Sequence, residues 1–124
     1  MNHVELCERL FAGLQNNQPD AVSDVCGPTF SAYQNGGAAM SLQDLLGFNS
    51  AVQHVVPDFH YEDQVCAATE QGFVEEHRVC GTLPDGTALN LFACVVGEVA
   101  QGQIVVLREY VDSFAARGLL KALQ

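Results

Sequence analysis

The sequence predicts an α+β domain in which helices cover one face of an antiparallel sheet. Helical periodicity dominates the chain up to Pro57, and four long β-prone segments follow from Asp58 onward. The connections between these segments are short and contain glycine, as in a meander. Because the helices precede the strands instead of alternating with them, two separate layers are expected. A chain of 124 residues corresponds to one domain, 1–124, which is large enough to bury a core.

Two helices are expected at the start of the chain. Residues 3–17 place apolar side chains on one helical stripe, which contains Val4, Cys7, Phe11 and Leu14. A second, short helix has Pro19 and Asp20 in its first turn, where a fixed φ and an acidic side chain both favour helix initiation. Gly27 and Pro28 are expected to end this helix.

A short strand and a third helix come next. The stretch "TFSAYQN" at 29–35 is β-prone, and a pair of glycines interrupts it. Ser41 and Asp44 resemble a capping box, in which each side chain bonds the backbone N–H of the other residue. The apolar residues that follow predict a helix that Pro57 closes.

The second half of the chain predicts a four-strand meander and a closing helix. The strands are expected at roughly 58–69, 73–83, 87–99 and 103–112. Asp112 or Ser113 is expected to cap the last helix, which is rich in leucine. Three to four helices would then cover a sheet made of the meander and the short N-terminal strand.

The turn between the second and third of these strands predicts a register. Asp85-Gly86 is the strongest two-residue hairpin signal, typical of a type I′ turn. A two-residue loop at this position places Arg78 opposite Ala93 on the neighbouring strand. Glu76 then lies on the same face as Arg78, because side chains alternate with a period of two.

The last turn predicts which residue faces Ala93 from the other side. In Ala100-Gln101-Gly102 the glycine comes third, which suits a three-residue loop with a left-handed last residue. This loop places Glu109 opposite Ala93, so that the long side chains of Arg78 and Glu109 meet over a small alanine. The face is otherwise apolar, and its expected pocket-lining residues include Cys80, Leu91, Ala93, Leu107 and Val111.

The opposite face of the same strands is also largely apolar, with Phe92, Val96, Val106 and Tyr110. The helices can cover only one face of the sheet, so the other face needs a second cover. We therefore expect a homodimer formed through the outer sheet face.

Composition limits the partners and the compartment. The net charge of −10 argues against nucleic acid and anionic membranes, which bind basic patches. The start of the chain has neither the basic residues nor the apolar core of a signal peptide, so we expect a cytoplasmic protein. The five cysteines show no C-x-x-C spacing, which predicts free buried thiols, no disulfide and no metal site.

Several short stretches resemble the nuclear transport factor 2-like superfamily, in particular its SnoaL-like branch and the limonene epoxide hydrolases. They are "YQN" at 33–35, "VVPDFHYE" at 55–62, "GTLPDG" at 81–86, "LNL" at 89–91 and "REYVD" at 108–112. The resemblance covers nearly the whole chain. It implies a conical, strongly curved sheet around a deep apolar pocket, often in dimers.

The resemblance also implies roles for individual residues. In the epoxide hydrolases, the tyrosine and asparagine of a "YQN" stretch help to hold a water molecule, which points to Tyr33 and Asn35. The acid of the "REYVD" strand is the base that activates this water, which points to Glu109. An Arg followed two residues later by an acid matches Arg78, but Cys80 stands in place of the acid. An ungapped count from Pro84 instead matches Glu76 and Arg78 in reversed order.

The SnoaL-like cyclases offer a different catalytic acid. Their aspartate lies near the end of the last strand, where Asp112 is the match in this sequence. The predicted register places Asp112 on the face opposite Glu109, which favours Glu109.

Two hypotheses about function follow. The first is a small-molecule enzyme of the isomerase, cyclase or epoxide-hydrolase kind, which uses Glu109 as general base on a hydrophobic substrate and needs no cofactor. Arg78, Glu76, Tyr33 and Asn35 would orient the reacting groups. The second is a non-catalytic binding module for a hydrophobic small molecule, with Glu76, Arg78 and Glu109 as a structural ion-pair cluster.

Overall fold

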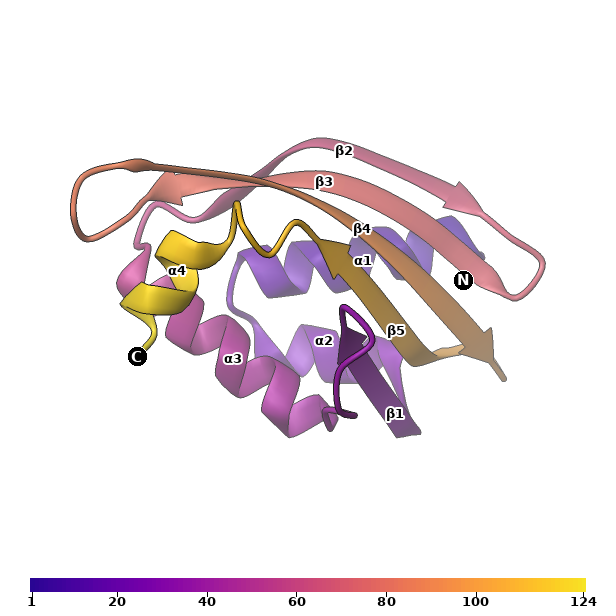
Figure 1. Ribbon diagram of the computed structural model, residues 1–124. Coiled ribbons are helices and arrows are strands. Elements are labelled where there is room, and N and C mark those ends of the chain that lie inside the picture. The colour runs from indigo at the N-terminus through magenta and orange to yellow at the C-terminus, as the bar shows by residue number, and fades with distance from the viewer.

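The computed structural model describes all 124 residues and confirms the α+β prediction. The helices α1, α2 and α3 lie beneath a strongly curved five-stranded sheet, and α4 lies at one end of it (Figure 1). The elements in chain order are α1 (His3–Gln15), α2 (Pro19–Val25), β1 (Cys26–Gln34), α3 (Leu42–Val55), β2 (His60–Ala68), β3 (Gly72–Thr82), β4 (Ala88–Ala100), β5 (Gln103–Val111) and α4 (Arg117–Ala122). None of the four helices has the length and apolar character that a bilayer-spanning helix requires.

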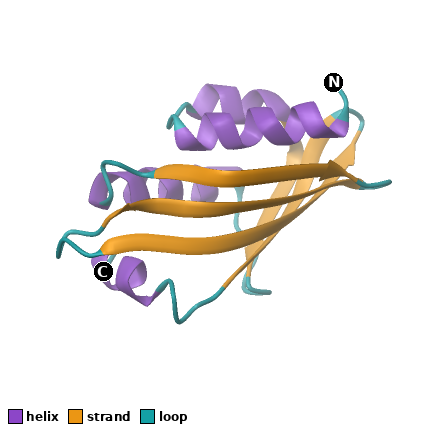
Figure 2. Ribbon diagram, turned by 90° about the horizontal axis from the view of Figure 1, so that it is seen from above, coloured by secondary structure: helices purple, strands orange, loops and turns teal.

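The sheet has the strand order β1-β5-β4-β3-β2. Strands β2 to β5 form the expected antiparallel meander, and β1 adds to β5 in the parallel direction, so the sheet is mixed. Seen from above, the strands at the two ends of the sheet run in clearly different directions, as the twist of strands requires (Figure 2). Strand β1 is longer than expected and includes Gly27 and Pro28. Both residues are tolerated there because β1 is an edge strand and its pairing with β5 is irregular between Cys26 and Ser31.

Local side-chain chemistry sets the ends of two helices. At α3 the predicted capping box is present, because Asp44 N–H donates to Ser41 Oγ and Ser41 N–H donates to Asp44 Oδ2. At the end of α1, the carbonyl of Leu14 accepts from Asn17 N–H and also from the side chains of α3, from Asn49 Nδ2 at 2.9 Å and from Gln53 Nε2 at 2.6 Å. The two side-chain bonds hold α3 against the end of α1 and help to satisfy a buried carbonyl.

The apolar interior divides into two clusters. The larger one joins α1 and α2 to the sheet around Phe73 and Ile104, both of which are fully buried. The smaller one joins the end of α3 and α4 to β3 and β4 around Val56 and Leu91. The two clusters leave a space between the helices and the concave face of the sheet, and the site described below lies there.

The turn between β3 and β4 differs from the prediction. Leu83 and Thr87 close a three-residue loop, with Gly86 N–H donating to the Leu83 carbonyl and Gly86 in the left-handed region at φ +88°. Pro84 has no N–H to complete the closing pair of a two-residue loop, and it suits the second position of a type I turn. The pairing therefore moves by one residue, and every side chain of β3 changes face.

The turn between β4 and β5 also differs from the prediction, because its loop has two residues instead of three. Gln101 and Gly102 form a two-residue turn, both with positive φ, and Ala100 pairs with Gln103. An irregularity between Glu98 and Val99 adds a further shift of one residue. The two shifts together are even, so Leu107, Glu109 and Val111 keep the predicted face although their partners change, whereas Ile104, before the irregularity, is fully buried in the core.

The cysteines also differ from the prediction. Cys7 of α1 and Cys66 of β2 form a disulfide, whereas Cys26, Cys80 and Cys94 are free. The prediction of five free thiols is therefore wrong. The two bonded residues are separated by 59 positions in sequence, and only the packing of α1 against β2 brings them together.

Candidate active site

A cavity of about 300 Å³ opens between the helices and the concave face of the sheet. Its walls are mostly apolar, and its polar groups are few. The apolar lining includes Phe11, Phe48, Phe59, Val79, Leu91, Val95, Leu107 and Val111, and the polar groups are Tyr33, Gln34, Asn35, Asn49, Tyr61, His77, Glu109 and Ser113. An apolar cavity with a few convergent polar groups is the usual form of a small-molecule site.

Glu109 points into this cavity from β5, as predicted. Its Oε1 accepts a hydrogen bond of 3.1 Å from Gln34 Nε2, and its Oε2 has no hydrogen-bond partner in the protein. Every side-chain nitrogen or oxygen atom that is fully shielded from solvent has a hydrogen-bond partner. The unpaired Oε2 atom is therefore not fully shielded and faces the cavity. Burial raises the pKa of the Glu109 carboxyl above its ordinary value, and neither the positive charge that a protonated His77 carries nor the bond from Gln34 fully offsets this rise.

A second polar pair lies across the strands from Glu109. Glu75 and His77 of β3 are almost completely buried, with side-chain exposures of 0% and 2%. His77 Nδ1 lies 2.6 Å from Glu75 Oε1 and 2.8 Å from Oε2, and because a carboxylate only accepts, Nδ1–H is the donor. Gln64 Nε2 donates to Glu75 Oε2 at 2.9 Å and completes the support of this carboxylate.

The strand register explains why these groups converge. Glu75 of β3 is opposite Val95 of β4, which is opposite Glu109 of β5, and Glu109 is next to Gln34 of β1. One row across the concave face therefore carries two carboxylates, separated by a valine. This row replaces the predicted row of Arg78, Ala93 and Glu109.

Tyr61 and His77 form the aromatic part of the site. Their ring centroids are 4.3 Å apart, and Phe11 packs against both rings. Neither His77 Nε2 nor the Tyr61 hydroxyl has a hydrogen-bond partner in the protein, and both residues line the cavity. Burial, together with the charges of Glu109 and Glu75, raises the pKa of Tyr61, so its hydroxyl stays protonated and can donate.

Tyr33 and Asn35 both line the cavity, at the end of β1. Asn35 also joins β1 to β5, because its N–H donates to the Glu109 carbonyl at 2.8 Å and its Oδ1 accepts from Val111 N–H at 2.9 Å. Asn35 adopts a positive φ of 50°, a conformation that asparagine tolerates better than most residues.

Three of the predicted site residues lie elsewhere. Arg78, Glu76 and Cys80 are on the outer face of the sheet, and none of them lines the cavity. Arg78 instead pairs with Asp63 at 3.1 Å and with Glu62 at 3.3 Å. The predicted cluster of Glu76, Arg78 and Glu109 is thus wrong, because the shift of one residue in the β3–β4 turn exchanges the two faces of β3.

The pocket-lining residues predicted on β4 and β5 lie on the concave face of the sheet. Leu91, Leu107 and Val111 line the cavity, and Ala93 is buried on the same face without reaching it. The prediction that Asp112 or Ser113 caps the last helix is wrong, because Asp112 accepts from Phe114 N–H at 2.9 Å in the turn before α4, and the N-cap Ala116 makes no side-chain bond. Sequence reasoning missed Glu75 and His77, and the missing N–H of Pro84 was the signal that would have placed them correctly.

Comparison with known proteins supports the fold. No family model matches the sequence, and no curated protein matches it. Among solved structures, a protein described as a SnoaL-like polyketide cyclase from Jannaschia sp. CCS1 has a TM-score of 0.81 at 19% identity, over 93% of this chain and 88% of that one. An LEH-like epoxide hydrolase from M. tuberculosis has a TM-score of 0.75 at 21% identity, over 98% of this chain and 91% of that one.

A third similar structure is that of TerC co-crystallised with polyporic acid. Its TM-score is 0.80 at 13% identity, and the match covers 96% of this chain and 98% of TerC. These likenesses show that the chain has the nuclear transport factor 2-like fold in the form seen in SnoaL-like proteins, as the sequence motifs predict. At such low identities they establish the fold and not the reaction.

Proposed function

We propose that this protein is a cofactor-independent acid–base enzyme that acts on a hydrophobic small molecule, with Glu109 as the general base. The observation that carries the proposal is the free Oε2 of Glu109, which faces an apolar cavity without any protein partner. A carboxylate in such surroundings is a stronger base than one in water, because burial raises the pKa of its conjugate acid.

The Glu75–His77 pair provides a second position for proton transfer. Glu75 holds the Nδ1–H of His77, so the Nε2 atom presents a lone pair toward the cavity. A proton that arrives at Nε2 forms an imidazolium next to the buried Glu75 carboxylate, which stabilises the positive charge. His77 can therefore accept a proton from the bound molecule and later return it, while Glu109 removes a proton from another position in the same cavity.

Tyr61 completes a reaction site for a carbonyl or epoxide substrate. Its protonated hydroxyl can donate a hydrogen bond to an oxygen atom that gains negative charge in the transition state. The rings of Phe11, Phe59 and Tyr61 form an aromatic wall that suits a planar ring. The neighbours that are described as cyclases, and TerC with its bound polyporic acid, agree with this substrate class.

The size of the cavity limits the substrate. About 300 Å³ is at the lower end of the range for small-molecule sites, so we expect a compact ligand with one or two rings. The mostly apolar lining, with Glu109 as its one acidic group, favours a neutral molecule that carries one carbonyl, hydroxyl or epoxide oxygen.

The alternative is a binding module in which the same polar row only orders the interior. In that case the bond from Gln34 to Glu109 and the bond from His77 to Glu75 are structural, and the protein retains a ligand without changing it. The two functions predict the same binding but differ in whether a proton leaves the bound molecule.

Proton exchange tests this difference without knowledge of the natural substrate. A panel of small cyclic ketones in D₂O is incubated with the protein, and deuterium incorporation next to the carbonyl is measured by mass spectrometry. A parallel panel of cyclic epoxides is assayed for diol formation. We expect activity with members of at least one panel and a loss of about 100-fold or more in Glu109→Gln, the range typical of a removed general base.

Glu76→Gln is the matched control, because Glu76 is an exposed glutamate on the outer face of the sheet. It should retain full activity. Saturable binding of these compounds, without exchange or hydrolysis above the buffer rate, would instead support the binding module.

A further inference from the structure

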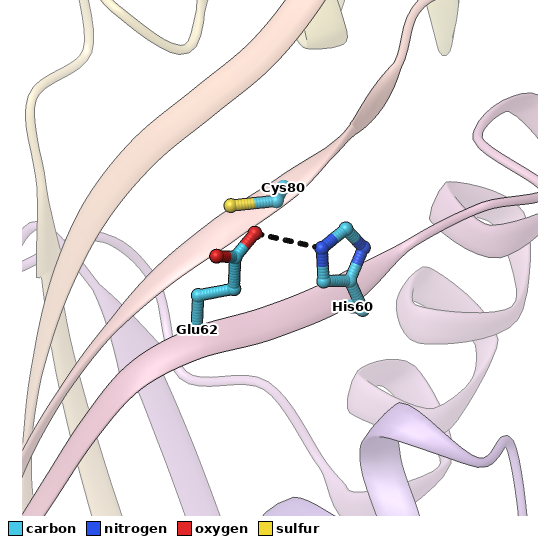
Figure 3. A group of neighbouring side chains, drawn as sticks. All are labelled: His60, Glu62 and Cys80. Atoms are coloured by element: carbon cyan, nitrogen blue, oxygen red, sulfur yellow. Dashed lines mark hydrogen bonds and ion pairs between the residues drawn. The ribbon is translucent and has the colours of Figure 1, made fainter.

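Three side chains with metal-ligating atoms meet on the outer face of the sheet, opposite the cavity. His60 and Glu62 are two positions apart on the edge strand β2, so they share a face, and His60 is directly opposite Cys80 of β3. The ligating atoms of the three residues all lie within 4.8 Å of one another. Figure 3 shows the imidazole, the carboxylate and the thiol turned toward a common point.

The protein holds the His60 ring in a defined orientation. Its Nδ1 lies 2.8 Å from the backbone carbonyl of Asp58, which can only accept, so Nδ1 carries the hydrogen. The Nε2 atom lies 2.8 Å from Glu62 Oε2, and because a carboxylate only accepts, Nε2–H is the donor in the metal-free protein (Figure 3). Histidines that bind metals are typically oriented by this kind of bond from the other ring nitrogen to a backbone carbonyl.

The Glu62 carboxylate and the Cys80 sulfur are held from the other side by Arg78. Arg78 Nη2 lies 3.3 Å from Glu62 Oε1, which leaves Oε2 for the side facing His60. Arg78 Nη1 lies 3.4 Å from the sulfur of Cys80, a residue that is only 6% exposed. The three ligating atoms thus have supporting contacts of their own, and the two more exposed side chains can still rotate toward an ion.

We propose that His60, Glu62 and Cys80 form a binding site for a divalent metal ion of the zinc class. Nitrogen and thiolate donors select such ions over Mg²⁺ and Ca²⁺, which prefer oxygen. The ion would draw the donor atoms to about 3–4 Å from one another, which follows from metal–ligand bonds of about 2.0–2.3 Å. With three protein ligands, a water molecule or another exchangeable ligand takes the fourth position.

The charges around the site are compatible with a divalent cation. His60 Nε2 and the Cys80 thiol each give up a proton to solvent on binding, so the neutral imidazole adds no charge, and the thiolate and the Glu62 carboxylate together balance the two positive charges of the ion. The charge of Arg78 is balanced by Asp63, whose Oδ2 lies 3.1 Å from Arg78 Nε. Asp58 anchors the same region, because it accepts from both the N–H and the hydroxyl of Thr82.

The position of the site indicates a structural role. The metal would join the edge strand β2 to β3 near the start of β2, on the face of the sheet that does not carry Glu109. The proposed catalytic function does not depend on this ion. Removal of the metal should therefore lower the thermal stability of the protein and leave the Glu109-dependent reaction in place.

Metal titration of the purified, non-reduced protein tests the proposal. Zn²⁺ is titrated in competition with a chromophoric chelator, and Co²⁺ is added separately to detect the near-ultraviolet charge-transfer band of a thiolate-bound cobalt ion. We expect one equivalent of bound Zn²⁺, the cobalt band and a rise in the thermal midpoint when Zn²⁺ is present. Cys80→Ser should lose the band and weaken Zn²⁺ binding by about 10-fold or more.

Two further variants make the result decisive. His60→Gln removes an exposed ligand that has no part in the core, and it should weaken Zn²⁺ binding as Cys80→Ser does. Cys94→Ser is the matched control, since Cys94 is another free thiol of the same sheet, on β4, and lies outside the cluster. Unchanged Zn²⁺ affinity in His60→Gln, or a cobalt band that persists in Cys80→Ser, would overturn the proposal.

Discussion

The substitution Glu109→Gln should have opposite effects on activity and stability. Folding takes the Glu109 carboxyl from water into the cavity, where burial raises its pKa above the unfolded value of about 4.5. Between pH 4.5 and the higher pKa of the folded state, the native protein binds more protons than the unfolded chain. The free energy of unfolding therefore falls as the pH rises through this window, and the penalty is complete above it.

Glutamine removes this pH-dependent penalty and keeps the main contact. Its side-chain carbonyl can still accept from Gln34 Nε2, a neutral bond that contributes about 1 kcal/mol. The folded and unfolded states differ by at most one bound proton at this site. The stability of the wild type relative to Glu109→Gln should therefore fall by at most about 1.4 kcal/mol per pH unit within the window. Near pH 4 the pH-dependent part of the difference should vanish.

Urea denaturation of both proteins at a series of pH values between 4 and 9 measures this difference. If Glu109 is the general base, kcat/KM in the wild type should also rise with pH, with a midpoint above the ordinary value of 4.5. The reasoning fails if the wild type becomes more stable relative to Glu109→Gln as the pH rises. That result would mean that an ion pair stabilises the carboxylate, as in the structural hypothesis.

Three other predictions concern the fold. Gly97→Ala should destabilise the protein by about 1–3 kcal/mol, because the added Cβ would collide with the buried ring of Phe73; chemical denaturation should show it, and an unchanged midpoint would contradict the packing. The denatured, non-reduced protein should titrate three thiols instead of five, and reduction of the Cys7–Cys66 disulfide should cost about 4 kcal/mol if loop entropy dominates. Light scattering should show a dimer of the 13.3 kDa chain, and Phe92→Glu should yield a monomer, because Phe92 is 71% exposed on the outer sheet face.

Local signals in the sequence were sufficient for most of the elements. The Ser41–Asp44 capping box predicts the start of α3, because both of its bonds form within one helical turn. The alternation of apolar side chains and the glycine-containing turns predict the four meander strands to within a few residues. The inward orientation of Glu109 follows from this alternation, and it survives because the shift of β5 is even.

Other features depend on contacts between distant segments. Strand β1 could add to either edge of the meander, and its parallel pairing with β5 is decided by the packing of α2 and α3 around it. The pairing of Cys7 with Cys66 follows from the way α1 lies on β2. No pattern within either segment reports such a contact.

The sequence by itself thus determined the α+β class, the order of the elements and an acid that points into an apolar interior. The tertiary structure decided which groups meet that acid, because one residue in the β3–β4 loop exchanges the faces of β3. It brings His77 to the cavity beside Glu109, with Glu75 bonded to His77, and moves Arg78 and Cys80 to the outer face, beside His60. Alternation along a strand is a local property, whereas the register between strands is set by turn geometry and the fit of the whole core.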